Sequence, residues 1–135
     1  MDPSKRLENV EKVLDELREL AGSGAVIIVE GKRDRQSLME LGVKGQILLA
    51  THSPLLSFTD KVSKKCNEAV IMTDWDAHGE RLAVRIMEYL QSVGTIPNNK
   101  LRLRLKSLVK KEVTAVEDLS RYVEKLRLKT SPQNY

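Results

Sequence analysis

Apolar positions in the first part of the chain recur three and four residues apart, which is the spacing of a helix with one buried face. Asp2 is suited to cap such a helix and Pro3 to occupy its first turn. The pattern predicts an amphipathic helix within residues 1–24 that ends at Gly22 or Gly24 and packs on the rest of the domain. Its apolar positions are Leu7, Val10, Val13, Leu14, Leu17 and Leu20.

Three short apolar runs follow, and each predicts a strand that is buried on both faces, as in a parallel sheet. They lie at residues 25–29, 46–50 and 68–72. Helical spacing of apolar residues separates these runs and follows the last of them. Helices are therefore predicted around residues 38–41, over 54–64 and around 82–90, with Gly94 and Pro97 closing the last unit.

The pattern changes at residues 101–106, where apolar and basic side chains alternate strictly. This alternation predicts a strand at the edge of the sheet. Thr114 and Glu117 have the spacing of a capping box, and an apolar stripe from Val116 to Leu126 predicts a final helix. The sequence thus predicts one α/β domain over residues 25–129, with a flexible tail at 130–135.

This order of elements predicts three layers, with a mostly parallel, Rossmann-like central sheet of about four strands flanked by helices. The length of 135 residues fits one such domain. With 41% hydrophobic residues and no apolar stretch of about 18 residues, the composition argues against a membrane protein. The charged start of the chain also lacks the apolar core of a secretory signal.

Cys66 is the only cysteine, which excludes an intramolecular disulfide and a cysteine-rich zinc site and favours a cytoplasmic location. The net charge of +4 and the pI of about 9.2 allow attraction to nucleic acid but do not establish it.

Two carboxylates one residue apart stand in the stretch TDWDAHGE, directly after the third apolar run. Glu30 follows the first run in the same way. Because parallel strands end at one edge of a sheet, Glu30, Asp74 and Asp76 are expected to converge there. Side chains alternate along extended backbone, so the two aspartates can point the same way and Trp75 the other. Ligands of oxygen alone suit Mg²⁺, or Mn²⁺, and such an ion lets a phosphodiester approach an acidic pocket.

Each carboxylate also has a structural explanation when it is considered alone. Asp76 could cap a helix that starts near Ala77, and Glu30 could pair with Lys32 or Arg33. Their joint position at two strand ends favours a functional site over these explanations. A P-loop is excluded, because Val26 stands where its first glycine belongs and Arg33 where its Ser or Thr belongs.

The two motifs together resemble a known family. Val29-Glu30-Gly31-Lys32 with Asp34 behind it, and then Thr73-Asp74-x-Asp76-x-x-Gly79-Glu80, are similar to the motifs of the Toprim domain. That domain occurs in type IA and type II topoisomerases, bacterial-type primases, OLD-family nucleases, RecR-type recombination proteins and rRNA-maturation endonucleases. The resemblance covers roughly residues 25–110 and is strongest to the primase and rRNA-maturation branch and to small stand-alone Toprim proteins.

The resemblance implies a role for each motif residue. Glu30 would transfer a proton at the scissile phosphodiester with help from Asp34, and Asp74 and Asp76, together with Glu30, would hold Mg²⁺. The supporting loop residues would be Gly31, Lys32, Gly79 and Glu80. Trp75 and Ala77-His78 depart from the topoisomerase pattern, and the chain has no room for a strand-passage gate, so a topoisomerase is not expected.

Three further side chains are candidates for contact with nucleic acid. Trp75 could stack on a base or pack under its loop. Arg102 and Arg104 could contact phosphates from the predicted edge strand, or could block unwanted strand pairing there. His52 and His78 could also face the site, but a loop position with an ordinary hydrogen bond is the favoured explanation for each of them.

The predicted function is Mg²⁺-dependent cleavage or processing of phosphodiester bonds in RNA or structured DNA, as by a nuclease. The alternative is a non-catalytic module that binds nucleic acid or protein in a repair, replication or RNA-processing complex. The oligomeric state stays open.

Overall fold

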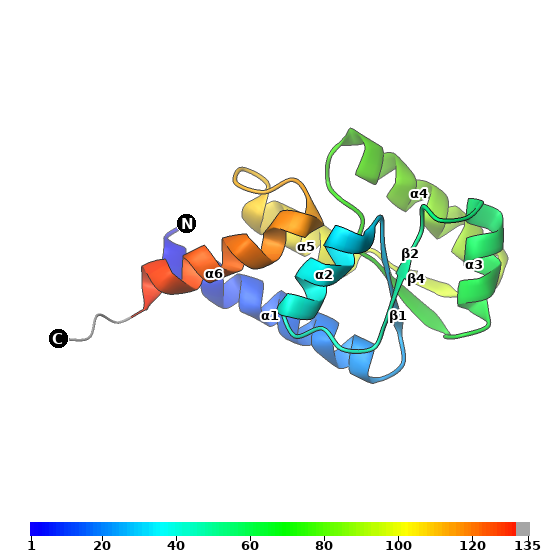
Figure 1. The fold of residues 1–135 in the computed structure, drawn as a ribbon, viewed down its shortest axis with the longest axis horizontal. Helices are drawn as coiled ribbons and strands as arrows, with labels where there is room; N and C mark the ends of the chain where they lie inside the picture. The colour runs from blue at the N-terminus through cyan, green and yellow to red at the C-terminus, as the bar shows by residue number, and fades with distance from the viewer. Residues whose placement is uncertain (132–135) are drawn as a thin grey trace.

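A four-stranded parallel sheet lies between two layers of helices in the computed structural model, which describes residues 1–131 (Figure 1). This arrangement confirms the predicted α/β fold and its three apolar strands. The elements in chain order are α1 (Pro3–Gly22), β1 (Val26–Val29), α2 (Lys32–Glu40), β2 (Gln46–Leu49), α3 (Leu55–Ser63), β3 (Glu68–Ile71), α4 (Ala77–Ser92), β4 (Ile96–Asn98), α5 (Lys100–Val109), the 3₁₀ turn η1 (Val116–Asp118) and α6 (Leu119–Thr130).

The strands lie in the order β2-β1-β3-β4, and every neighbouring pair is parallel. From β1 the chain moves outward to β2 and then crosses back past β1 to reach β3. The strand order therefore reverses between β1 and β3, which is where ligands bind in open sheets of this kind. Glu30 follows β1 and Asp74 lies three residues beyond β3, so both stand at this point.

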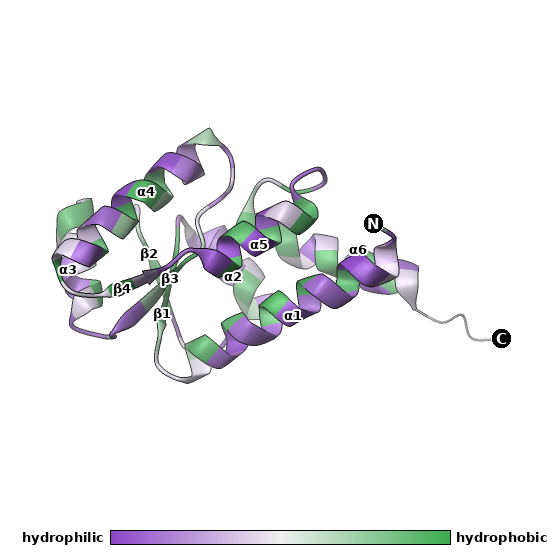
Figure 2. Cartoon of the chain, turned by 180° about the vertical axis from the view of Figure 1, so that it is seen from behind, coloured by the Kyte–Doolittle hydropathy of each residue, from purple (hydrophilic) through white to green (hydrophobic). Residues whose placement is uncertain are grey.

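Each face of the sheet has its own hydrophobic core. Because side chains alternate along a strand, Ile27 and Val29 of β1 enter one core and Val26 and Ile28 enter the other. The first core is covered by α1, α2, α5 and α6, and the second by α3 and α4. Apolar stripes on these helices face the sheet, while their outer surfaces are polar (Figure 2).

The first helix begins as predicted. Asp2 is its N-cap, and its carboxylate accepts the Lys5 N–H at 3.0 Å, while Pro3 occupies the first helical position. The helix packs against α5 and α6 at the side of the domain away from β4 (Figure 1).

The prediction of an edge strand at residues 101–106 is wrong. This segment is helix α5, and the short strand β4 before it forms that edge of the sheet. In a strict alternation, every second apolar residue lies four positions from the previous one. Four positions is also the spacing of residues on one face of a helix, so the pattern fits a helix as well. Leu101, Leu105 and Val109 form the buried stripe of α5, whereas Leu103 is 47% exposed. Arg102 is fully buried on the same face, so its predicted exposed position beside phosphates is also wrong.

The capping box predicted at Thr114 and Glu117 does not form either. Residues 116–118 make a 3₁₀ turn, and α6 begins at Leu119. The carbonyl of Thr114 accepts the backbone N–H of Trp75 instead, at 3.1 Å. This segment is therefore held by the loop after β3 rather than by its own side chains.

Helix α6 includes Thr130, the first residue of the predicted tail, and the rest of that prediction from residue 132 lies outside the described residues. None of the helices within residues 1–131 combines the length and the apolar character that a membrane crossing needs.

Candidate functional site

Carboxylates from two neighbouring strand ends meet above the switch point of the sheet. The backbone N–H of Asp74 donates to Oε2 of Glu30 at 2.8 Å, which joins the loop after β3 to the loop after β1. Asp34 lies at the start of α2, where its Oδ2 accepts the Gly31 N–H at 2.9 Å. The three acidic side chains therefore lie close together at the ends of β1 and β3. The sequence predicted this proximity for Glu30 and Asp74.

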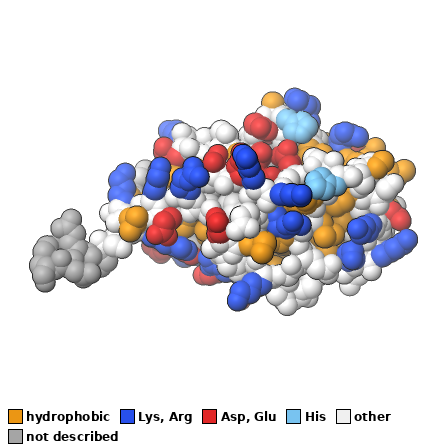
Figure 3. All heavy atoms as spheres, in the orientation of Figure 1, with side chains coloured by type: hydrophobic (Ala, Val, Ile, Leu, Met, Phe, Trp, Pro, Cys, Tyr) orange, Lys and Arg blue, Asp and Glu red, His pale blue; other side chains and the backbone are white. Residues whose placement is uncertain are grey.

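These side chains line an open hollow of about 480 Å³. Its lining residues are Glu30, Gly31, Lys32, Arg33, Asp34, Thr51, Asp74 and Glu117. Figure 3 shows acidic side chains gathered between α2 and the start of α4, with basic side chains at their border. The hollow thus combines a carboxylate floor with a cationic rim formed by Lys32 and Arg33, which are both exposed.

The crowding of carboxylates changes their proton affinity. Burial raises the pKa of Asp74 from 3.8 to about 7, against the hydrogen bond from the Val116 N–H, which lowers it. The charges of Asp34, Glu30 and Asp76 add to the increase. Burial likewise raises the pKa of Asp34, with a further contribution from Glu30 and opposition from the Gly31 N–H. Mutual repulsion of this kind is relieved by a cation.

Asp76 has a structural role in the fold. It is the N-cap of α4, and its Oδ1 accepts the Gly79 N–H at 2.7 Å. The capping explanation considered for this residue is therefore correct, although its charge still acts on Asp74.

The donor chemistry of the site fits Mg²⁺, which prefers oxygen ligands and keeps several waters. Hydrogen bonds engage Oδ1 of Asp74, Oδ1 of Asp76 and Oε2 of Glu30, which leaves the second oxygen of each carboxylate for a ligand. Within residues 1–131, however, no three His, Cys, Asp or Glu side chains are already arranged to hold a metal ion. The site therefore fits a cation that is bound by few carboxylates and completed by water and phosphate oxygens.

The two glycines of the motifs, Gly31 and Gly79, differ in how much space a side chain would have. A Cβ on Gly79 would lie 1.9 Å from the Asp74 carbonyl oxygen, so no side chain fits there. The carbonyl of Gly79 also accepts the Thr73 hydroxyl at 2.8 Å. A Cβ on Gly31, by contrast, would meet nothing closer than the Asp34 carboxylate at 3.9 Å. Gly79 keeps the Asp74 loop tight, whereas Gly31 leaves open space at the hollow.

Glu80 faces away from the hollow toward α5. Its Oε1 accepts the Lys106 ammonium at 2.5 Å, and its Oε2 lies 3.4 Å from Nη1 of Arg102. The hydrogen bond from Lys106, followed by the charge of Arg102, lowers the pKa of Glu80. The residue thus acts as the counter-charge of two cations on α5.

Trp75 packs under the loop instead of reaching into the hollow, with 6% of its surface exposed. Its indole Nε1–H donates to the Val113 carbonyl at 2.5 Å, and its backbone N–H donates to Thr114. The stacking role considered for this residue is therefore wrong. Arg104 is exposed on helix α5, not on an edge strand, and pairs with Glu16 of α1.

Replacing Trp75 by Phe tests this structural role. The ring would still fill the core, but the Val113 carbonyl would lose its donor, so we expect a loss of about 1–2 kcal/mol in the free energy of unfolding. Denaturant unfolding measures this loss. Nucleic-acid affinity should stay unchanged, and a variant with wild-type stability and weakened binding would restore the stacking role.

Three features of the site have no recognisable signal in the sequence. The segment at residues 113–116 holds the Asp74-Trp75 loop, and its Val116 N–H donates to Oδ1 of Asp74 at 2.7 Å. Glu117 lines the hollow, and the Thr51 hydroxyl donates to the Glu30 carbonyl at 2.6 Å. These contacts join residues more than 20 positions apart, and no local pattern marks them.

The two histidines, His52 and His78, differ in their position relative to the carboxylates. His78 is 66% exposed at the start of α4, and its Nε2 stands 3.6 Å from Oε1 of Glu30. His52 is exposed in the loop after β2. Of the two histidines, His78 is thus the one beside the candidate proton-transfer residue Glu30, at a distance that is too long for a hydrogen bond.

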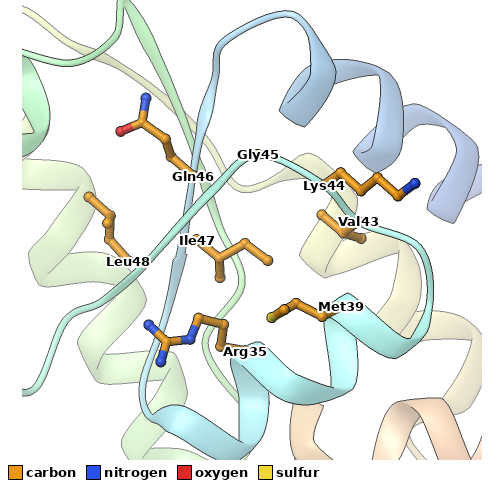
Figure 4. A pocket seen from close by; sticks show the side chains of 8 residues that line it. All are labelled: Arg35, Met39, Val43, Lys44, Gly45, Gln46, Ile47 and Leu48. Carbon is orange, nitrogen blue, oxygen red and sulfur yellow. The ribbon is translucent and has the colours of Figure 1, made fainter.

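A larger hollow of about 580 Å³ lies away from the carboxylates, along the outer strand β2. In Figure 4, Met39 of α2 and Ile47 of β2 lie next to each other there, while the guanidinium of Arg35 extends away from both. Its lining includes two cationic side chains, Arg35 and Lys44, and no carboxylate. It therefore lacks the donors that the candidate site brings together, in spite of its size.

Comparison with known proteins agrees with this geometry. The family model described as Toprim domain matches residues 25–108, which is more than half of the chain and includes both acidic motifs. The chain belongs to the Toprim domain family. Segment 113–116 and η1 follow the matched region, so the family match does not include their contacts to the Asp74 loop.

The chain is also similar to small archaeal proteins over most of their length. It is 50% identical to a UPF0292 protein of Methanosarcina barkeri, over 93% of this chain and 88% of that protein. It is 38% identical to a UPF0292 protein of Pyrococcus horikoshii, over 81% of this chain and 80% of that protein. A solved structure of a protein from Aquifex aeolicus matches with a TM-score of 0.70 and 26% identity, over 80% of this chain and 95% of that one. Small stand-alone Toprim proteins are therefore its relatives.

Proposed function

We propose that this Toprim protein is a Mg²⁺-dependent enzyme that cleaves or otherwise processes phosphodiester bonds in RNA or structured DNA. Membership of the Toprim family implies a metal-dependent function related to nucleic acid. The observation that carries the finer proposal is the hydrogen bond of 2.8 Å between the Asp74 N–H and Glu30. This bond supports the proposal because it joins Glu30, the proposed proton-transfer group, to the loop that carries Asp74, beside a hollow open to a polymer.

The carboxylates of Glu30, Asp34, Asp74 and Asp76 each have a part in this proposal. Asp74, with Glu30 and Asp76, would hold Mg²⁺, or Mn²⁺ in its place. When bound, the ion supplies positive charge that offsets the negative charge developing on the phosphate. Glu30 would exchange a proton with the reacting oxygen, with Asp34 beside it.

Phosphate groups would meet the cationic rim first. Lys32 and Arg33 stand at the start of α2, where backbone N–H groups and the helix dipole also favour an anion. Their exposed side chains suit contacts to a polymer backbone rather than to bases. The free thiol of Cys66 suits the cytoplasm as the place of action.

A second candidate is a non-catalytic module that binds nucleic acid or protein in a repair, replication or RNA-processing complex. It is favoured by the lack of a preformed group of three metal ligands among residues 1–131. In that case the carboxylates would still bind a cation weakly, and a partner would complete the site.

Cleavage assays on end-labelled single-stranded DNA, duplex DNA and structured RNA distinguish the two candidates. Each substrate is incubated with Mg²⁺, Mn²⁺ or EDTA, and wild type is compared with Glu30→Gln. We expect metal-dependent products that fall about 100-fold or more in the variant, because it has lost its proton-transfer group. Products that survive in Glu30→Gln would contradict the role of Glu30. Intact substrates throughout, with metal binding preserved, would support the non-catalytic module.

A further inference from the structure

Arg102 is a fully buried arginine on α5, and its guanidinium points at the loop after β3. Its Nε donates to the Thr73 carbonyl at 2.8 Å, and its Nη2 donates to the Asp74 carbonyl at 2.5 Å. We propose that Arg102 is a positioning residue that fixes the backbone from which the Asp74 carboxylate reaches the site. This inference rests on the proposed function, because it concerns the same carboxylates.

The chemistry of the side chain suits this role. Two consecutive carbonyls beyond the end of β3 are matched by the planar fork of a guanidinium, whose donors have a fixed geometry. A lysine ammonium has no such fork and cannot reach both carbonyls in the same way. A buried cation needs a counter-charge, which Glu80 supplies at 3.4 Å from Nη1. Lys106 in turn holds Glu80 at 2.5 Å.

Arg102 completes a set of contacts that surrounds Asp74. The N–H of Asp74 is bound to Glu30, and its Oδ1 is bound to the Val116 N–H. Arg102 holds the carbonyl on the third side. If the guanidinium is lost, the Asp74 backbone can move, and the contacts to Glu30 and Val116 weaken with it. The catalytic carboxylates would then lose their fixed relative position without losing any of their own atoms.

Hydrogen exchange measured by NMR tests this positioning directly in Arg102→Lys. The reporters are the amides of Asp74 and Val116, and the reference is the amide of Met72, directly after β3, which donates to the Ile28 carbonyl of β1 at 2.7 Å. We expect exchange of the two reporters to accelerate at least about tenfold relative to Met72. The matched control is Leu105→Ala, which removes core packing from the same helix and should not single out the reporters.

Metal affinity provides a second readout. Residues that orient metal ligands typically change affinity by about 10- to 100-fold when they are replaced. Mn²⁺ binding followed by electron paramagnetic resonance should therefore weaken about tenfold or more in Arg102→Lys and stay near wild type in Leu105→Ala.

The outcomes separate this inference from the proposed function. Unchanged reporter exchange relative to Met72 in Arg102→Lys would overturn the positioning role, whatever the metal data show. A wild-type protein that binds no Mn²⁺ would overturn the proposed metal site, while hydrogen exchange would still decide on Arg102. If Arg102→Lys does not fold, the double variant Arg102→Met with Glu80→Gln removes the buried cation together with its partly exposed counter-charge, and the same exchange criterion applies to it.

Discussion

Replacing Asp74 by Asn is expected to stabilise the protein at pH 8 in the presence of EDTA. The Asp74 carboxylate has a pKa of about 7 in the folded protein, against an ordinary value of 3.8. Its ionisation in the fold therefore costs free energy that the amide of Asn avoids. The amide oxygen can still accept the Val116 N–H, so the loop keeps this hydrogen bond. A shift from 3.8 to about 7 corresponds to about 4 kcal/mol, or on the order of 15 °C in melting temperature.

The sign of the pH dependence follows from proton binding. Between pH 3.8 and about 7, the folded Asp74 holds its proton more than the unfolded one does, so this residue makes wild-type stability fall as the pH rises. The difference between Asp74→Asn and wild type should thus be small near pH 4, grow through this range, and level off above about pH 7. Comparing the two proteins cancels the contributions of the other carboxylates, whose shifts differ in direction.

Thermal melts of both proteins at a series of pH values in EDTA measure this difference. Asp2→Asn is a matched control, because Asp2 caps α1 at the surface and Asn caps helices equally well. Its stability difference from wild type should not grow between pH 4 and pH 8. An Asp74→Asn protein that is less stable than wild type at pH 8 would contradict the electrostatic description of the site.

The strands and the acidic motifs were predictable because their signals are local. A β-branched run buried on both faces, such as Val26 to Val29, differs from any helical pattern. A carboxylate that follows such a run lies near the strand end, and parallel neighbouring strands end at the same edge, so Glu30 and Asp74 are predicted to lie together. Asp76 shows the limit of this argument, since a turn into a helix redirects a side chain that strict alternation would aim at the site.

Helix α5, the burial of Arg102 and the role of the segment at residues 113–116 could not be predicted, because they depend on contacts between distant segments. The alternation at residues 101–106 fits both a strand and a helix, and only contacts with α1 and with the loop after β3 select the helix that buries Arg102. A buried arginine is recognisable only when its carbonyl partners are known, here at Thr73 and Asp74. The segment at residues 113–116 likewise acts through backbone groups, which the identity of its side chains does not reveal.

Gly79→Ala is expected to destabilise the protein strongly, although alanine is the better helix former. Helical propensity alone favours alanine over glycine by about 1 kcal/mol within a helix. At this position the added Cβ would lie 1.9 Å from the Asp74 carbonyl oxygen and 2.5 Å from its carbonyl carbon. These are backbone atoms that Arg102 holds from the other side, so they cannot move away cheaply. We expect a loss of about 3 kcal/mol or more in the free energy of unfolding.

The matched control for this clash is Gly22→Ala at the end of α1. A Cβ on Gly22 meets nothing within 4 Å, so the helical preference for alanine acts there without opposition. Denaturant unfolding should show Gly22→Ala equal to wild type or slightly more stable, and Gly79→Ala far less stable. Because the clash displaces Asp74 itself, Mn²⁺ affinity should fall in Gly79→Ala alone. A Gly79→Ala protein as stable as wild type would mean that the loop after β3 adopts another path, and the position assigned to the Asp74 carboxylate would be wrong.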